Sequence, residues 1–158
     1  MDATEVTDYI CKAFPGVETT TAYSYTFFFY GSERMLPFAT LATADNEHDR
    51  VSDLDRDGAY RLNVGVSRET YRSLFGDEKP RLGPAGVIDT GHDFTLRDQI
   101  LPHPHYAPQS WVCVVSPGEE TFEVVRGLLR EAYDRAVLRA TRKEASELMD
   151  LDDEERSG

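Results

Sequence analysis

The sequence predicts an α+β domain, in which an antiparallel sheet of about five strands packs against an N-terminal helix and a long C-terminal helix. Two observations predict this class. Most strand-like segments follow one another in the first half of the chain, and helical segments flank them. There is also no glycine-rich phosphate-binding loop of the kind that joins strand to helix in alternating α/β folds. The 158 residues suffice for one domain with a core of its own.

Two short helices are expected from their spacing and their ends. Apolar side chains recur at helical spacing in residues 4–14, and Pro15-Gly16 would end that helix. Residues 68–75 predict a second helix, because Ser67 is a suitable N-cap and Gly76 follows the last turn.

The C-terminal part predicts the longest helix. From residue 119 to residue 137 one face stays apolar for about five turns. The segment Ser116-Pro117-Gly118-Glu119 has the spacing of a capping box at its start. We therefore place the domain at residues 1–141 and expect the acidic residues 142–158 to fray or to be disordered.

Five segments have strand patterns: residues 19–23, 26–30, 38–43, 60–66 and 111–115. The segments 26–30 and 111–115 are apolar on both faces, which is typical of covered central strands. In residues 60–66 apolar and polar residues alternate, so Arg61 and Asn63 should lie on the face away from the core.

The remaining segments predict connections. Gly31–Arg34 should form a turn, and residues 77–91, rich in Pro and Gly, a long loop. Residues 95–101 predict one or two helical turns that Pro102 would end.

Composition and charge limit the class of protein. With 29 acidic and 17 basic residues the net charge is −12, and no basic cluster is present, so nucleic acid is not the expected partner. No apolar run could span a membrane, the N-terminus is acidic rather than signal-like, and there are only two cysteines, so we expect a cytoplasmic protein. The 14 Arg against 3 Lys and the excess of carboxylates fit a salt-adapted, halophilic cytoplasm or an ordinary high-GC bacterium equally well.

Six blocks of sequence, taken together, resemble the domain-of-unknown-function family 6194 over roughly residues 5–138. The blocks are Thr26-Phe27-Phe28-Phe29-Tyr30, Pro37-Phe38-Ala39-Thr40, Val51-Ser52-Asp53-Leu54-Asp55-Arg56, Tyr60-Arg61-Leu62-Asn63-Val64-Gly65-Val66, His92-Asp93-Phe94, and His103-Pro104-His105-Tyr106-Ala107 leading to Gln109-Ser110-Trp111-Val112-Cys113. The family has no assigned activity, so the resemblance implies no reaction.

A more distant resemblance is to the MmcQ/YjbR-like proteins, small α+β domains with a CyaY-like fold. It depends on the strand Trp111–Val115 and the long helix that follows it. Those proteins are loosely described as DNA-binding. The acidic charge of this chain departs from that description, so the resemblance implies the fold and not the ligand.

Two patterns suggest metal binding, and each has a simpler interpretation. His103 and His105, with His92, Asp89 and Asp93 upstream, could face one ion, because side chains two apart in an extended segment point the same way and a carboxylate could complete the shell. No second spaced pair of ligands accompanies them, so local hydrogen bonding in a Pro-rich loop is the simpler interpretation. The segment 53–58 begins like a calcium loop, but Val64 stands where a bidentate Glu is required, which favours a solvated acidic turn. We therefore predict no metal and no cofactor.

Nucleophilic catalysis has little support in the sequence. Cys11 and Cys113 lie among apolar residues, Ser67 and Ser116 are explained as helix caps, and no Gly-x-Ser-x-Gly motif is present. No catalytic residue is predicted.

A ligand-binding face is the leading hypothesis, and its residues are Arg61, Asn63, His103, His105 and Trp111. Arg61 could hold an anion, Asn63 could orient it, and Trp111 could stack on a planar group. The alternative is a sheet face covered by a helix, on which Arg61 pairs with one of the many carboxylates. If Arg61 binds a ligand, Arg61→Ala should abolish recognition and leave the melting temperature nearly unchanged.

The sequence therefore predicts a non-enzymatic module that binds a small anionic or planar ligand or a protein. A small metal-assisted or acid/base enzyme using His92, His103 and His105 is the alternative. Nucleic-acid binding is a third possibility, for which only Arg68, Arg72, Lys79 and Arg81 could begin a basic stripe.

Overall fold

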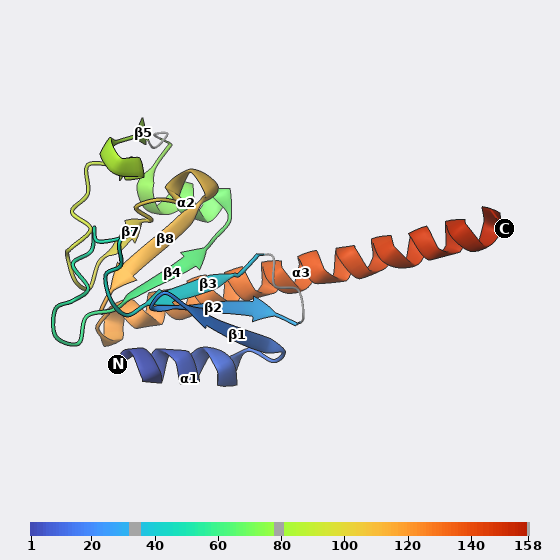
Figure 1. The fold of residues 1–158 in the computed structure, drawn as a ribbon, viewed down its shortest axis with the longest axis horizontal. Coiled ribbons are helices and arrows are strands. Elements are labelled where there is room, and N and C mark those ends of the chain that lie inside the picture. The colour runs from blue at the N-terminus through green and yellow to red at the C-terminus, as the bar shows by residue number, and fades with distance from the viewer. Residues whose placement is uncertain (32–35, 78–80, 158) are drawn as a thin grey trace.

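A computed structural model describes residues 1–31, 36–77 and 81–157, and it has the expected α+β architecture (Figure 1). Its helices are α1 (Ala3–Ala13), α2 (Arg68–Phe75) and α3 (Glu119–Ser157). The main sheet contains β1 (Val17–Ala22), β2 (Tyr25–Tyr30), β3 (Ala39–Ala42), β4 (Arg61–Gly65), β7 (Ile100–Pro102) and β8 (Trp111–Val115). Its six strands are antiparallel in the order β1-β2-β3-β4-β8-β7.

Helices α1 and α3 cover one face of this sheet, and the main core lies between them and the strands (Figure 1). From β4, Leu62 and Val64 point into this core, where they meet apolar side chains of α1 and α3 such as Ile10 and Leu129. Since side chains alternate along a strand, Arg61 and Asn63 point to the opposite face, as the sequence predicted.

Connecting segments, rather than helices, cover the opposite face. Leu54 and Ala59, from the connection between β3 and β4, pack with buried residues of β3 and β8. Phe94, from the segment before β7, packs beside Cys113. Arg56 ties the two segments together, because its Nη2 donates to the carbonyl of Thr95 at 2.8 Å. This loop-covered face contains the candidate site.

Both predicted short helices are confirmed, together with their caps. The Asp2 carboxylate accepts a hydrogen bond from the backbone N–H of Glu5 at 2.8 Å, and the Ser67 hydroxyl accepts one from that of Thr70 at 3.1 Å. These bonds satisfy amides that the first helical turn leaves free. The five predicted strands are also present, with ends that differ by a few residues.

Other local predictions were wrong. Residues 95–101 do not form helical turns; instead Ile100–Pro102 is strand β7, which pairs only with β8 among the described strands. An edge strand tolerates proline because its outer side needs no N–H donor. The expected loop 77–91 contains a small hairpin of β5 (Arg81–Leu82) and β6 (Ile88–Asp89), while residues 78–80 lie outside the described part. The turn predicted at Gly31–Arg34 is also outside it, apart from Gly31.

The start of α3 is capped from another part of the chain. Asp98 Oδ1 accepts a hydrogen bond from the backbone N–H of Gly118 at 2.7 Å. Ser116, the expected cap, lies too far before the first helical residue, and its hydroxyl accepts from the backbone N–H of Tyr60 at 3.3 Å instead. The predicted capping box is therefore not formed.

Helix α3 continues through the acidic segment for which the sequence predicted fraying or disorder. Its C-terminal half extends away from the sheet (Figure 1), and the side chains of residues 141–151 are all exposed. Residues 141–151 are mostly Glu, Leu, Arg, Lys, Ala and Met, and these residues have high intrinsic helix propensity. Propensity, rather than packing, accounts for the helix here.

Candidate ligand-binding site

A buried ion pair lies at the centre of the loop-covered face. Arg61, at the start of β4, is fully buried, and Asp49, from the connection between β3 and β4, is 7% exposed. The guanidinium binds the carboxylate through two hydrogen bonds, Nη2 to Oδ2 at 2.5 Å and Nη1 to Oδ1 at 3.2 Å. Nη1 also donates to Ser52 Oγ at 3.0 Å, and Nε donates to Asn63 Oδ1 at 2.9 Å. Every nitrogen of the guanidinium thus has an internal acceptor.

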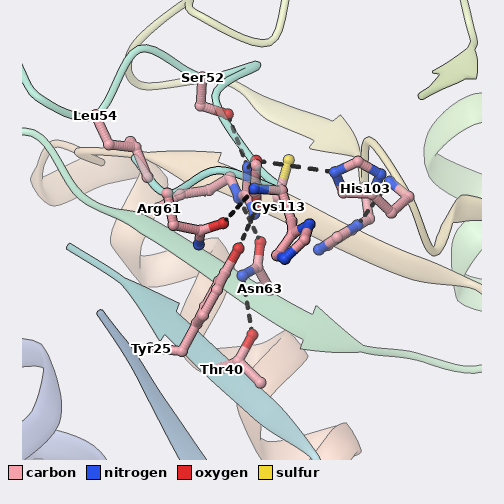
Figure 2. A network of polar contacts seen from close by, with 12 residues as sticks. Tyr25, Thr40, Ser52, Leu54, Arg61, Asn63, His103 and Cys113 are labelled. Carbon is pink, nitrogen blue, oxygen red and sulfur yellow. Dashed lines mark hydrogen bonds and ion pairs between the residues drawn. The ribbon is translucent and has the colours of Figure 1, made fainter. Parts of the chain in front are cut away.

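This arrangement corrects the expectation that Arg61 projects from the sheet to hold an external anion. Its partner is the carboxylate of Asp49, as the simpler interpretation of the sequence had it. Asn63 is also buried, and its amide Nδ2 donates to Thr40 Oγ1 at 2.9 Å. Tyr25 and Thr40, from β2 and β3, point towards this pair from the neighbouring strands (Figure 2). Tyr25 completes the network by donating its hydroxyl hydrogen to Asp49 Oδ2.

The charges of the network reinforce one another. Burial alone would raise the pKa of Asp49, but the facing His105 and the bound Arg61 guanidinium outweigh it and hold that pKa well below its usual range. Burial and the adjacent carboxylate raise the pKa of Tyr25 to about 12. Asp49 is therefore ionised at neutral pH while Tyr25 stays a neutral donor.

His103 is held as a neutral imidazole. Its Nδ1 accepts hydrogen bonds from the backbone N–H groups of His105 and Tyr106, both at 3.0 Å. An accepting Nδ1 requires the ring proton to be on Nε2. Complete burial, and then the positive charge of Arg61, lower the pKa of His103 well below its usual value.

His105 is in a different electrostatic setting. Its Nδ1 is 3.4 Å from the carbonyl oxygen of Gly86, and its Nε2 is 3.8 Å from Asp49 Oδ1. Nε2 is buried yet has no hydrogen-bond partner. When Nδ1 donates to the carbonyl, a neutral ring would turn the Nε2 lone pair towards the carboxylate, so the protonated ring is favoured. Accordingly, the interaction with Asp49 raises the pKa of His105 despite partial burial.

These groups form part of the wall of a pocket of about 380 Å³. The pocket is lined by Tyr23, Tyr25, Phe27, Thr40, Asn46, His48, Asp49, His103, His105 and Tyr106. The hairpin of β1 and β2 supplies three of the aromatic rings, and the segment before β8 supplies Tyr106 and the two histidines. The volume lies within the range typical of small-molecule sites.

The hairpin turn presents Tyr23 in an unusual conformation. Tyr23 and Ser24 have φ values of 52° and 69°, in the left-handed region that residues with a side chain rarely adopt. Thr43 holds the turn, because both its backbone N–H and its hydroxyl donate to the carbonyl of Ser24, at 3.0 and 3.2 Å. Tyr23 is nonetheless 85% exposed at the pocket. Strain of this kind often accompanies functional positions.

The other residues named from the sequence lie elsewhere. Trp111 does not line this pocket; it packs over Gly65 and meets the His103 ring edge-on, at 6.3 Å between centroids. His92 contacts Phe75 and Thr90 rather than joining the other histidines. Within residues 1–31, 36–77 and 81–157, no group of three His, Cys, Asp or Glu side chains is arranged to hold a metal ion.

The remaining motifs have local roles. In the calcium-like segment, Asp55 accepts a hydrogen bond from the backbone of Asp45, and the Asp53 carbonyl accepts one from Arg56. Burial raises the pKa of Cys113 to about 12, so its thiol is unreactive.

The four residues of the possible basic stripe are divided between elements. Arg68 and Arg72 lie on α2 and Arg81 on β5, while Lys79 is outside the described residues. No helix in the described chain is both long and apolar enough to cross a lipid bilayer.

Sequence reasoning named His103 and His105 but missed the rest of the pocket, above all Asp49, Tyr25 and Tyr106. Asp49 is one of 29 acidic residues and has no distinguishing neighbours in the sequence. The exposed position of Tyr23 depends on a turn that its sequence, Tyr-Ser, does not predict. Two signals in the sequence pointed to this region: the polar pair Arg61 and Asn63 on the strand face opposite the core, and the His103-Pro104-His105 motif.

The fold and the pocket define an α+β protein in which a helix-free sheet face supports a small-molecule-sized cavity. The chain belongs to a family of unknown function, DUF6194, whose model matches residues 1–145. A crystal structure of a protein from Pseudomonas syringae, a structural-genomics target, is similar with a TM-score of 0.51 and 17% identity, covering 86% of this chain and 99% of that one. At that identity the likeness concerns the fold alone. A search of curated proteins finds no match.

Proposed function

We propose that this protein binds a small molecule in the pocket between the β1–β2 hairpin and the segment 103–106. One observation carries the proposal: the pocket combines exposed aromatic side chains with a buried polar base that places two imidazoles, His103 and His105, in the pocket wall. Aromatic side chains that stay exposed at a pocket of this size offer apolar surface that a small molecule would bury.

Rigid walls also support a binding role. The ion pair, Asn63, Ser52 and Thr40 hold one another in fixed positions below the pocket. Tyr106 packs at a tilt against the fixed His103 ring, with a centroid distance of 5.0 Å and an interplanar angle of 38°. Pre-positioned groups lower the entropic cost of binding. The pocket volume suits a small molecule better than a protein segment, so we place a small ligand ahead of a protein partner.

A fragment screen by ligand-observed NMR tests the proposal. We expect several aromatic fragments to bind wild-type protein in competition with one another and to lose most of that binding in Tyr106→Ala. Leu82→Ala is the matched control, since Leu82 is an exposed apolar residue outside the pocket. A screen without hits, or hits that persist in Tyr106→Ala, would contradict the proposal.

An acid/base enzyme is the second candidate, because the Asp49 carboxylate orients and charges the His105 imidazole at the pocket wall. Wild-type protein and His105→Gln can be incubated with the same metabolite extract and compared by mass spectrometry. Compounds consumed only by the wild type would favour catalysis, and an unchanged extract would favour simple binding.

The proposed kinship with MmcQ/YjbR-like proteins has separate support in the strand Trp111–Val115 followed directly by α3. We do not extend it to DNA binding, because a net charge of −12 opposes phosphate contacts.

A further inference from the structure

We propose that the pocket selects a planar ligand that carries a carboxylate or a similar oxyanion, with the oxyanion beside the imidazoles of His103 and His105 and the planar part against the aromatic rings. This inference rests on the proposed function and specifies its ligand. It is argued from the donors, the charges and the ring surfaces that the pocket offers.

The hydrogen-bond acceptors at the base of the pocket are already in use. Asp49 Oδ2 accepts from Tyr25 and Arg61, and Oδ1 accepts from Arg61 and faces His105. The side-chain amide oxygen of Asn46, Oδ1, accepts from the backbone N–H of His48 at 2.8 Å. A ligand that must donate hydrogen bonds would therefore compete with internal donors.

Donors, in contrast, remain available. His105 Nε2 is not one of them, because it is buried and faces Asp49 Oδ1 at 3.8 Å; the protonated ring contributes its charge instead. Thr40 Oγ1 accepts from Asn63, which leaves its own hydroxyl hydrogen free to donate. The neutral His103 has its ring hydrogen on Nε2 and also lines the pocket. This donor set complements an oxyanion.

The local charge favours an anion over a cation. Arg61 and Asp49 neutralise each other within the base, so the imidazolium of His105 adds one uncompensated positive charge. The groups around His105 are Asp49, Arg61, His103 and Tyr106, and among them only Asp49 is negative. At the rim, the His48 ring lies 3.1 Å from Glu47. The overall charge of −12 repels anions at long range, but salt screens that repulsion beyond about 8–10 Å.

The aromatic side chains favour a flat partner. Tyr23 and Tyr106 are 85% and 55% exposed, although burying such rings is normally favourable. Tyr25 and Phe27 lie next to each other on one strand face, with centroids 6.0 Å apart. A planar molecule between the hairpin and Tyr106 would bury ring surface on both sides.

Four compounds of similar size separate charge from shape: benzoate, benzamide, benzamidinium and cyclohexanecarboxylate. Affinities are measured by NMR chemical-shift titration of the full chain near pH 6. We expect benzoate to bind at least about fivefold more tightly than benzamide, since a charge-assisted hydrogen bond exceeds a neutral one by roughly 1 kcal/mol. We expect benzamidinium and cyclohexanecarboxylate to bind more weakly than benzoate.

Variants locate the effect at His105. His105→Gln should remove most of the preference for benzoate, whereas His92→Gln, which alters an imidazole outside the pocket, should retain it. Because the pKa of His105 is raised, the preference should be present at pH 6 and decline as pH rises through that pKa. His48→Gln should keep the same pH profile, which separates the rim imidazole from His105.

The outcomes distinguish this inference from the proposed function. Tightest binding of benzamidinium, or equal binding of benzoate and benzamide, would overturn the oxyanion. Equal binding of benzoate and cyclohexanecarboxylate would overturn planarity. In either case fragment hits lost in Tyr106→Ala would leave the pocket's binding role intact, while an absence of hits in both experiments would end both proposals.

Discussion

Replacing Arg61 by alanine should destabilise the whole domain, contrary to what the sequence suggested. The substitution removes the guanidinium and its four hydrogen bonds, to Asp49, Ser52 and Asn63. The Asp49 carboxylate then stays 7% exposed without its positive partner. Removing one member of a buried ion pair costs about 3–5 kcal/mol. For a chain of this size that corresponds to a fall of about 6–20 °C in the melting temperature.

Urea unfolding followed by far-UV circular dichroism at pH 7 measures this cost. Arg50→Ala is the matched control, because Arg50 is a neighbouring, exposed arginine whose Nε donates only to the Asn46 carbonyl, at 3.2 Å. It should change the free energy of unfolding by less than about 0.5 kcal/mol. Adding Asp49→Ala to Arg61→Ala should cost less than the sum of the two single changes, since the stranded carboxylate is gone. A loss below about 1 kcal/mol for Arg61→Ala, or additive costs in the double variant, would refute the reasoning.

Three further predictions concern other parts of the molecule. In long-range ¹H–¹⁵N NMR spectra, His105 should titrate above about pH 6.5 and His103 well below it; the reverse order would contradict the proposed tautomers. Gly65→Ala should lower the free energy of unfolding by about 1–3 kcal/mol and shift the indole fluorescence, because the added Cβ would lie 2.9 Å from the Trp111 ring. Gly127→Ala, where the added Cβ meets open space, should stabilise α3 by about 0.5–1 kcal/mol. Deleting residues 142–158 should reduce the hydrodynamic radius but leave the melting temperature within a few degrees, and a large loss would reveal packing by the tail.

The stability that Asp49 and His105 contribute to the fold also depends on pH, with opposite signs for the two groups. The depressed pKa of Asp49 means that its contribution is present above about pH 4 and is lost as pH falls towards the folded-state pKa. The raised pKa of His105 means that its contribution is complete below about pH 6.5 and is lost as pH rises through the folded-state pKa.

Much of the fold could be predicted because its signals are local. The alternation in residues 60–66 depends on neighbouring residues of one strand. The apolar face of α3 depends on residues within a few helical turns. The predictions failed where contacts between segments distant in the sequence determine the local structure. Pro102 could be read as the end of a helix, but pairing of Leu101 with Cys113 makes the segment a strand. The N-terminal cap of α3 comes from Asp98, which no local motif indicates.

The site was less predictable than the fold for the same physical reason. Alternation identified Arg61 and Asn63 as a polar pair on the face opposite the core, and that placement is correct. Which residues cover a face of the sheet depends on the packing of the long connecting segments. The sequences of those segments show no periodicity. The contact between Asp49 and Arg61, and the position of Tyr23 and Tyr106 at the same pocket, are visible only in the three-dimensional structure.

The main core and the pocket lie on opposite faces of the sheet, so residues of the pocket can change without changing the core. The helix-covered face holds the main apolar core, whereas the pocket is built mainly from connecting segments and a hairpin tip. Substitutions at the outer ring of that pocket leave the packing of α1 and α3 untouched. Proteins of this family could therefore acquire new binding preferences by exchanging exposed aromatic residues, as long as the arginine–carboxylate anchor beneath them is preserved.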